Sequence, residues 1–284
     1  MIPAFKDLLE NPRGFPPGAP APQISDRVEF KDVLYGVDDI VSDWDAYGAY
    51  LRKEGRGEGP RVLLVSHDMT EIENITLMAL GGVVKGLNGA VRYALVNPEN
   101  CGRLDEIIAE FQPDWLGFNL YTGLTDHAFK WLRGYKLSAA ERVFHKRFSD
   151  FESADRALKE AVRENGGKPP ASGGKVLYAP VIVGGHYNNH DYKTSFVRGA
   201  DYSVRGKGVN LLKDILQGFF PPGIYHDPIS FPNLPEFDRA GFYRDTFAFS
   251  DKTKKYALSP IKSVLTALGC AYRCTYCYIG SLIE

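Results

Sequence analysis

The sequence predicts an α/β protein built around a doubly wound parallel sheet of five strands. Three observations lead to this fold class. Short continuous apolar runs, such as residues 62–65, are typical of parallel strands that are covered on both faces. Between the runs lie segments whose apolar residues recur at i, i+3, i+4 and i+7, as in helices. Glycines and small polar residues follow several runs, and a sheet of this kind binds its ligand at those strand ends.

The first half of the sheet is expected to contain three strands, at residues 62–65, 91–96 and 115–120. The helix after the first strand is indicated by four apolar residues at helical spacing, Leu80, Val83, Val84 and Leu87. The helix after the second strand is indicated in the same way by Leu104, Ile107, Ile108 and Phe111. Pro113 then ends this helix, because proline cannot continue the backbone hydrogen-bond ladder.

The second half of the sheet is interrupted by an insertion. A helix that begins near Thr125 continues into a charged stretch that is too long for a simple connection, so residues 137–175, approximately, are interpreted as a helical insertion. The fourth strand is expected at 176–183, where Pro180 interrupts it, and the fifth at 201–205. The predicted architecture is therefore a Rossmann-like, flavodoxin-like sheet, with its ligand at the carboxyl ends of the strands.

Changes in composition divide the chain into four parts. Residues 1–59 form an N-terminal extension, which is rich in proline at first and is then expected to form a short helix over 38–52. The sheet domain spans 60–219. Residues 220–258 are rich in aromatic residues and prolines and are interpreted as a linker, and residues 259–284 as the start of a second domain.

Three of the four cysteines lie close together near the end of the chain. Cys270, Cys274 and Cys277 have the spacing C-x3-C-x2-C and follow an apolar run. Thiolates are soft ligands, and a tight loop after a strand can direct three of them at one iron-sulfur cluster. A structural zinc ion usually has four protein ligands in paired groups, and disulfides require an even set in an oxidising compartment. The spacing favours the cluster, with zinc or structural thiols as the alternative.

This cysteine loop resembles that of the radical S-adenosylmethionine (radical SAM) enzymes, down to the aromatic Tyr276 just before the last cysteine. The resemblance implies that the three cysteines hold a 4Fe-4S cluster and that SAM binds the open iron of this cluster, with Tyr276 near the adenine. It also implies that a 5'-deoxyadenosyl radical starts the reaction. It also implies an electron donor such as flavodoxin or ferredoxin. Because the partial (β/α) barrel of these enzymes is much longer than the residues that follow Cys277, the chain is interpreted as a fragment containing only its first strand and cluster loop, unlikely to turn over alone.

Two runs at strand ends, VIVGGH at 181–186 and DYSVRGKG at 201–208, make residues 60–219 resemble the cobalamin-binding domain of B12-dependent radical SAM enzymes. Glycine lets the backbone approach a bulky ligand closely. The resemblance implies that cobalamin lies along the loops after the third, fourth and fifth strands, at Asn119, Tyr121, Thr122, Gly123, Gly184, Gly185, His186, Gly206 and Gly208.

One run departs from the pattern of this family. Many such domains carry Asp-x-His-x-x-Gly after the first strand, and its histidine ligates cobalt, whereas here His67 precedes Asp68. His67 is therefore not assigned as a ligand, and the lower face of cobalamin is expected to be open or contacted by another residue of this loop. Cys101 is interpreted as an incidental or buried thiol. A lone cysteine there weighs against methylthiotransferases, which carry a second cluster in the N-terminal domain.

The composition narrows the choice of partners and compartment. The formal net charge of -1 provides no electrostatic reason to expect a nucleic acid or an anionic membrane. The chain has no run of about 18 apolar residues and no signal-peptide pattern at its start. A reducing cytoplasm, which an oxygen-sensitive cluster would require, fits these observations.

The sequence thus predicts a cobalamin-dependent, methyltransferase-like radical SAM enzyme. Its substrate would be a small molecule or a peptide, and its reaction a methyl transfer or a rearrangement. Two alternatives remain open. The first is a radical SAM enzyme whose N-terminal domain binds no cobalamin, and the second is a non-catalytic cobalamin- or nucleotide-binding module with a structural metal.

Overall fold

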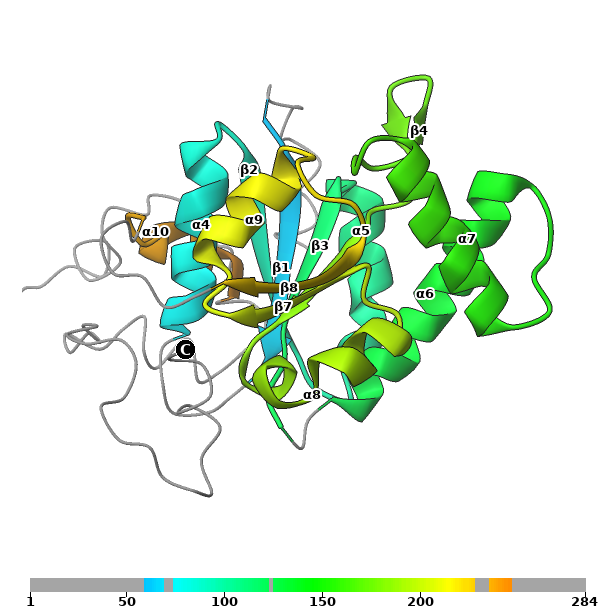
Figure 1. The fold of residues 1–284 in the computed structure, drawn as a ribbon. Coiled ribbons are helices and arrows are strands. Elements are labelled where there is room, and N and C mark those ends of the chain that lie inside the picture. The colour runs from blue at the N-terminus through cyan, green and yellow to red at the C-terminus, as the bar shows by residue number, and fades with distance from the viewer. Residues whose placement is uncertain (1–58, 69–73, 123–124, 228–234, 247–284) are drawn as a thin grey trace, which may run out of the picture.

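The structure is a computed structural model that describes residues 59–68, 74–122, 125–227 and 235–246. The centre of the described part is one sheet of six parallel strands in the order β2-β1-β3-β6-β7-β8 (Figure 1). The strands are β1 (Arg61–His67), β2 (Ala90–Val96), β3 (Trp115–Asn119), β6 (Val181–Gly184), β7 (Tyr202–Gly206) and β8 (Gly223–Asp227).

Helices cover both faces of this sheet. On one face α4 and α9 lie side by side, and α10 packs against β2 and α4 (Figure 1). On the other face α5, α6 and α8 cover the sheet, and α7 packs on α6. The helices are α4 (Ile75–Gly86), α5 (Leu104–Phe111), α6 (Asp126–Phe144), α7 (Phe151–Glu164), α8 (His186–Val197), α9 (Val209–Leu216) and α10 (Arg239–Thr246). A short antiparallel hairpin, β4 (Ala171–Ser172) and β5 (Lys175–Val176), follows α7.

The predicted α/β fold class is confirmed, because all six strands run parallel and helices cover both faces. The strand order reverses between β1 and β3, as in flavodoxin-like sheets. The sheet has one strand more than predicted, since β8 lies in the stretch interpreted as a linker. Exposed and half-buried residues alternate along most of this edge strand. It therefore lacks the continuous apolar run that predicts the inner strands.

The fourth predicted strand, 176–183, is two separate elements in the structure. β6 begins only at Val181, because Pro180 has no N–H group to donate to a strand ladder. The Pro180 carbonyl still accepts a hydrogen bond of 3.0 Å from the Leu116 amide. Lys175 and Val176 instead pair with Ala171 and Ser172 in the hairpin.

The core lies on both faces of β1, which is buried along its whole length. Successive side chains of a strand point to opposite faces. Leu64 therefore points to the side of α4 and α9, whereas His67 packs against His127 of α6. Phe118 of β3 likewise packs against Trp131 of α6, with 5.8 Å between ring centroids. The sheet thus separates two environments, one under α4 and α9 and one under α5 and α6.

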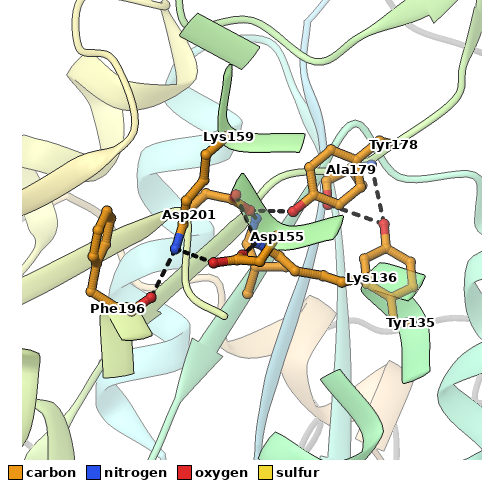
Figure 2. A network of polar contacts seen from close by, with 9 residues as sticks. Tyr135, Lys136, Asp155, Lys159, Tyr178, Ala179, Phe196 and Asp201 are labelled. Carbon is orange, nitrogen blue, oxygen red and sulfur yellow. Dashed lines mark hydrogen bonds and ion pairs between the residues drawn. The ribbon is translucent and has the colours of Figure 1, made fainter. Parts of the chain in front are cut away.

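A buried network of charged side chains joins the insertion to the sheet (Figure 2). Lys136 of α6 pairs with Asp155 of α7 and, at 2.8 Å, with Asp201 beside β7. Asp201 is fully buried and also accepts a hydrogen bond of 2.7 Å from the Val181 amide at the start of β6. Lys159 of α7 pairs with Asp155 at 2.6 Å. The insertion, which begins within α6, is therefore anchored to two strands at the amino end of the sheet.

The two edges of the sheet are protected differently. Along β2, the Tyr93 amide donates a hydrogen bond of 3.1 Å to the buried carboxylate of Asp245 in α10, and the Tyr93 hydroxyl donates one of 2.8 Å to Asp238. A helix that covers an edge strand prevents pairing with another chain. At the other edge Ile224 of β8 is 42% exposed. The contacts of Asp238 and Asp245 with Tyr93 show that residues 235–246 pack along β2, although the sequence assigns them to the linker.

α6 is the longest helix in the described ranges, with 19 residues, and charged residues are spread along it. None of the helices that the structure describes combines the length and the apolar character needed to cross a membrane.

Candidate ligand pocket

The carboxyl ends of β1, β3, β6 and β7 meet at one edge of the sheet, beside the point where the strand order reverses. The cofactor-binding residues predicted from the sequence lie at this edge wherever the structure describes them. They are Asn119, Tyr121, Thr122, Gly184, Gly185, His186, Gly206 and Gly208.

A cavity of about 360 Å³ opens here between the sheet and helices α4 and α9. We call it the α4–α9 cavity. Its walls are mainly apolar and include Leu64, Ile75, Leu80, Ile182, Val204 and Leu212. Every predicted residue named above except Thr122 lines it. The structure therefore brings residues from three separate loops around one cavity.

Asn119, at the end of β3, is held in place by its neighbours. Its amide nitrogen lies 3.4 Å from both the Asn74 side-chain oxygen and the Tyr121 hydroxyl. Ser66 of β1 donates a hydrogen bond of 3.0 Å to the Asn119 carbonyl and accepts one of 3.0 Å from Asn74. Asn74 also caps α4 by accepting a hydrogen bond from the Leu77 amide. These bonds connect β1, β3 and the first turn of α4 around the cavity.

The two glycines after β6 have different roles. Gly185 has a φ of +94°, and a Cβ atom there would lie 2.2 Å from the Asn119 side-chain oxygen, so only glycine fits. Gly184 has no such strain, and the nearest atom to an added Cβ would be the Val204 carbonyl oxygen at 3.7 Å. Gly185 therefore permits the close approach of two loops, whereas Gly184 leaves space beside the cavity.

The turn between β7 and α9 contains the other two predicted glycines. A Cβ on Gly206 would lie 2.0 Å from the Asp227 carbonyl oxygen, and Gly208 has a φ of +72° at the start of α9. Between them Lys207 lines the cavity. Burial lowers the pKa of Lys207, and the nearby Asp227 partly opposes this effect. The turn thus brings a cationic side chain to a mainly apolar cavity.

Tyr121, Thr122 and His186 lie at the rim of the cavity. The Tyr121 and His186 rings are stacked, with 6.4 Å between centroids and an angle of 13°. Thr122 Oγ1 is 3.3 Å from His186 Nδ1. Burial raises the pKa of the Tyr121 hydroxyl, and burial together with His190 lowers the pKa of His186. Both rings are therefore neutral at pH 7 and suit contact with a flat, uncharged ligand surface.

His67 lies on the other face of β1, away from the α4–α9 cavity. Its ring is 2% exposed and packs against His127, with 5.2 Å between centroids. Within the described part of the chain neither ring nitrogen of His67 has a hydrogen-bond partner. Burial, with a smaller effect from His127, lowers the pKa of His67 to about 4. His67, to which the sequence assigns no ligand role, therefore does not line the α4–α9 cavity.

Several predicted features lie outside the described residues. These are Gly123, Tyr276, the cysteines Cys270, Cys274 and Cys277, the helix over 38–52 and the start of the second domain at 259–284. Among the residues that are described, no group of three or more His, Cys, Asp or Glu side chains could hold a metal ion.

Cys101 is a buried thiol, as the sequence analysis expects. It is 6% exposed at the start of the turn before α5. Burial, together with the nearby Asp105, raises the pKa of its thiol to about 11. Because the thiolate is the nucleophile and the metal ligand, Cys101 is poorly suited to either role at neutral pH.

Sequence reasoning missed the cavity walls and three polar residues, Asn74, Asn189 and Lys207. Asn189 accepts a hydrogen bond of 2.8 Å from the Gly206 amide and so fixes the turn after β7. Asn74 carries a usable signal, because a polar residue before an apolar helix is a typical N-cap. The wall residues carry no such signal in the sequence, because Ile182 and Val204 have the pattern of ordinary core positions.

Comparisons of this chain with protein-family profiles, with curated proteins and with solved structures gave no match. The functional assignment therefore rests on the α4–α9 cavity and on the spacing of the cysteines.

Proposed function

We propose that this chain functions as a cobalamin-dependent radical SAM enzyme. In this proposal the α4–α9 cavity receives the nucleotide tail of cobalamin, and Cys270, Cys274 and Cys277 hold the 4Fe-4S cluster that binds SAM. The observation that carries the cobalamin assignment is the cavity, because it is apolar and lies at the carboxyl ends of the strands. The cysteine spacing carries the radical SAM assignment.

The chemistry of the cavity suits a flat heteroaromatic base. Its volume of about 360 Å³ is at the lower end of the range of small-molecule sites, about 300–1,000 Å³. Leu64, Ile182 and Val204 provide apolar walls, whereas Asn119 and Asn189 are two of the polar side chains that would orient a ring edge. A cavity of this size would hold the base, and the bulk of the cofactor would remain outside it.

The polar groups at the cavity suit the rest of a nucleotide tail. Lys207 contributes a positive charge, which favours a phosphate group, whereas the amino end of α9 already binds the carboxylate of Asp227 through the Asn210 amide. Tyr121 and His186 would exclude water from one side of the bound tail. These residues would bind and orient the cofactor and would not take part in bond making.

The cofactors would supply the difficult steps, namely radical initiation at the cluster and group transfer from cobalamin. The three thiolates would bind the cluster and leave one iron for SAM, with Tyr276 close to the adenine. The substrate would be a small molecule or a peptide, and the reaction a methyl transfer or a rearrangement. The electron donor would be a protein such as flavodoxin or ferredoxin.

The cobalamin assignment is tested by titrating the full chain with hydroxocobalamin and following the visible spectrum and co-elution in gel filtration. We expect saturable binding. Gly184→Leu should weaken it by at least about tenfold, because the added side chain enters free space beside the cavity without backbone strain. Gly86→Leu is the matched control, since it makes the same change in open space outside the α4–α9 cavity and should bind normally.

The outcomes separate the alternatives. If the folded wild-type protein does not bind hydroxocobalamin, the result favours the alternative of a radical SAM enzyme whose N-terminal domain binds no cobalamin. Equal binding by Gly184→Leu and wild type would place the cofactor elsewhere. A parallel titration with adenosine monophosphate and with flavin mononucleotide tests the nucleotide-binding alternative, because these ligands also present a flat base and a phosphate.

The radical SAM assignment is tested by anaerobic reconstitution of the full chain with iron and sulfide. We expect about four irons per chain and the broad visible absorbance of a cluster, and both should be lost in Cys274→Ala. Cys101→Ala is the control and should reconstitute like the wild type, because its thiol is buried and protonated. Stoichiometric zinc without iron uptake would favour the structural-metal alternative.

A further inference from the structure

Residues 235–246, which we call the connector, contribute one wall of the α4–α9 cavity. Phe237 is half-buried and lines the cavity together with Leu80 of α4 and Val209 of α9. Among the described residues that line the cavity, Phe237 alone comes from the chain after β8. Pro235 lines a smaller hollow between the same two helices. The connector therefore lies against both helices beside the cavity, and the proposed function makes no use of it.

Two adjacent glycines inside α4 allow this close approach. A Cβ atom on Gly82 would lie 1.9 Å from the Glu236 carbonyl oxygen. A Cβ atom on Gly81 would lie 1.6 Å from the Tyr93 hydroxyl, which donates a hydrogen bond to Asp238 of the connector. Glycine is less favourable inside a helix than any residue except proline. The helix therefore carries unfavourable residues at the two points where the connector and its partner from β2 approach it.

Asp238 fixes the connector on α4. Its buried carboxylate pairs with Lys85 at 2.5 Å and accepts the hydrogen bond of 2.8 Å from Tyr93. The Asp238 amide donates a hydrogen bond of 3.0 Å to the Met78 carbonyl. Because Phe237 directly precedes Asp238, these contacts also hold the backbone of Phe237 beside the cavity.

A ligand that contacts Phe237 links two equilibria. If the connector leaves α4, the cavity loses an apolar wall, so the ligand binds the docked form of the connector more tightly than the undocked form. The ligand must then stabilise the docked form by the same factor, because coupling between two binding equilibria is reciprocal.

We infer that Phe237 is a ligand-contact residue of the α4–α9 cavity, and that ligand binding and docking of the connector promote each other. The inference rests on the proposed function for the identity of the ligand, the nucleotide tail of cobalamin. The ring of Phe237 contacts the flat base, for which an aromatic surface is suited. In the sequence the cysteine run at 270–277 follows the connector, so occupancy of the cavity acts on the segment that leads to the proposed cluster.

The first test is a titration of the full chain with hydroxocobalamin. Phe237→Ala should weaken binding at least about fivefold, because a large apolar contact is lost. Phe237→Leu keeps an apolar side chain and should retain most of the affinity. Phe220→Ala is the matched control, since Phe220 is also half-buried against the core but does not line the cavity, and it should bind like the wild type.

Gly82→Ala tests the docking of the connector separately from its ring. Alanine favours the helix, so α4 should stay folded, whereas the added methyl group collides with the Glu236 carbonyl and displaces the connector. Gly82 does not line the cavity, yet the affinity should fall about as much as in Phe237→Ala. Combining the two changes should weaken binding no further, because both remove the same contact. Gly86→Ala adds the same methyl group to α4 in open space and should bind normally.

Hydrogen exchange followed by mass spectrometry gives the reciprocal measurement. Saturating hydroxocobalamin should slow exchange at residues 238–242 of the wild type by about the factor of affinity that Gly82→Ala loses. The Asp238 and Phe242 amides are suitable reporters, since both donate backbone hydrogen bonds. In Phe237→Ala the ligand should leave exchange of the connector unchanged, and exchange in α7 should not respond in either protein.

The outcomes distinguish this inference from the proposed function. Wild-type binding with equal affinity in Phe237→Ala, or with no change in exchange of the connector, would overturn the inference and leave the cobalamin assignment standing. If the wild type binds only adenosine monophosphate or flavin mononucleotide, the cobalamin assignment fails, whereas a fivefold loss of that nucleotide in Phe237→Ala would still support the inference. Binding of none of the three probes by the folded wild type would overturn both.

Discussion

At the scale of single residues, burial determines the chemistry of His67 more than its position in the sequence does. The residue follows the first apolar run, where a polar side chain predicts a role in binding. In the structure its ring is buried beside His127 on the far side of the sheet from the α4–α9 cavity. Because neither ring nitrogen has a hydrogen-bond partner among the described residues, nothing compensates a positive charge there.

His67 should therefore make the protein less stable in mild acid. Its pKa is about 4 in the folded state, whereas an unperturbed histidine has a pKa of 6.5. Below pH 6.5 the unfolded state binds the proton more tightly, so the free energy of unfolding falls as the pH drops from 6.5 toward 4. The full shift corresponds to a loss of about 3 kcal/mol.

Urea denaturation between pH 4 and pH 7.5 measures this loss. His67→Leu removes the titrating group and should flatten the decline. Identical pH profiles for wild type and His67→Leu would show that other groups cause the acid sensitivity.

At the scale of elements, the insertion is attached to the sheet by buried charges. Lys136 is fully buried between Asp155 of α7 and Asp201 beside β7, and Asp201 also holds the amide of Val181 in β6 (Figure 2). The sequence shows this stretch only as a charged segment, interpreted as a helical insertion. Its partners are 19 and 65 residues away along the chain, so no local pattern reveals the pairing.

Removing the central cation should destabilise the fold strongly. Lys136→Met leaves the buried carboxylate of Asp201 without its cation, while Asp155 keeps its pair with Lys159, and we expect the free energy of unfolding to fall by about 3–5 kcal/mol. Arg163→Met is the matched control, because it breaks a half-exposed pair with Glu160 within α7 and should cost less than about 1 kcal/mol. Urea denaturation at pH 7 compares the two, and equal losses would show that the Lys136 network adds no more than a surface pair.

At the scale of the whole molecule, the sheet separates two hollows of different character. The α4–α9 cavity is small, mainly apolar and located at the carboxyl ends of the strands, whereas a larger hollow of about 1120 Å³ along α5 and α6 is lined in part by Lys130, Arg142 and Lys175.

The sequence by itself determined the α/β fold class and which loops lie at the carboxyl edge of the sheet. Burial on both faces leaves a continuous apolar run in each inner strand, and parallel connections bring the carboxyl ends of these strands together. This is why the sequence predicts that Asn119, Gly184 and Gly206, which are far apart in the chain, lie at one edge of the sheet, where they line the same cavity.

Only the tertiary structure decided the rest. β8 is a strand because it pairs with β7. Its alternation of half-buried and exposed residues does not predict a strand from the sequence. The walls of the α4–α9 cavity, the face of the sheet on which His67 lies and the partners of Lys136 likewise depend on residues far apart in the chain. Such features arise when separate elements pack against one another, and periodicity within one element carries no information about that packing.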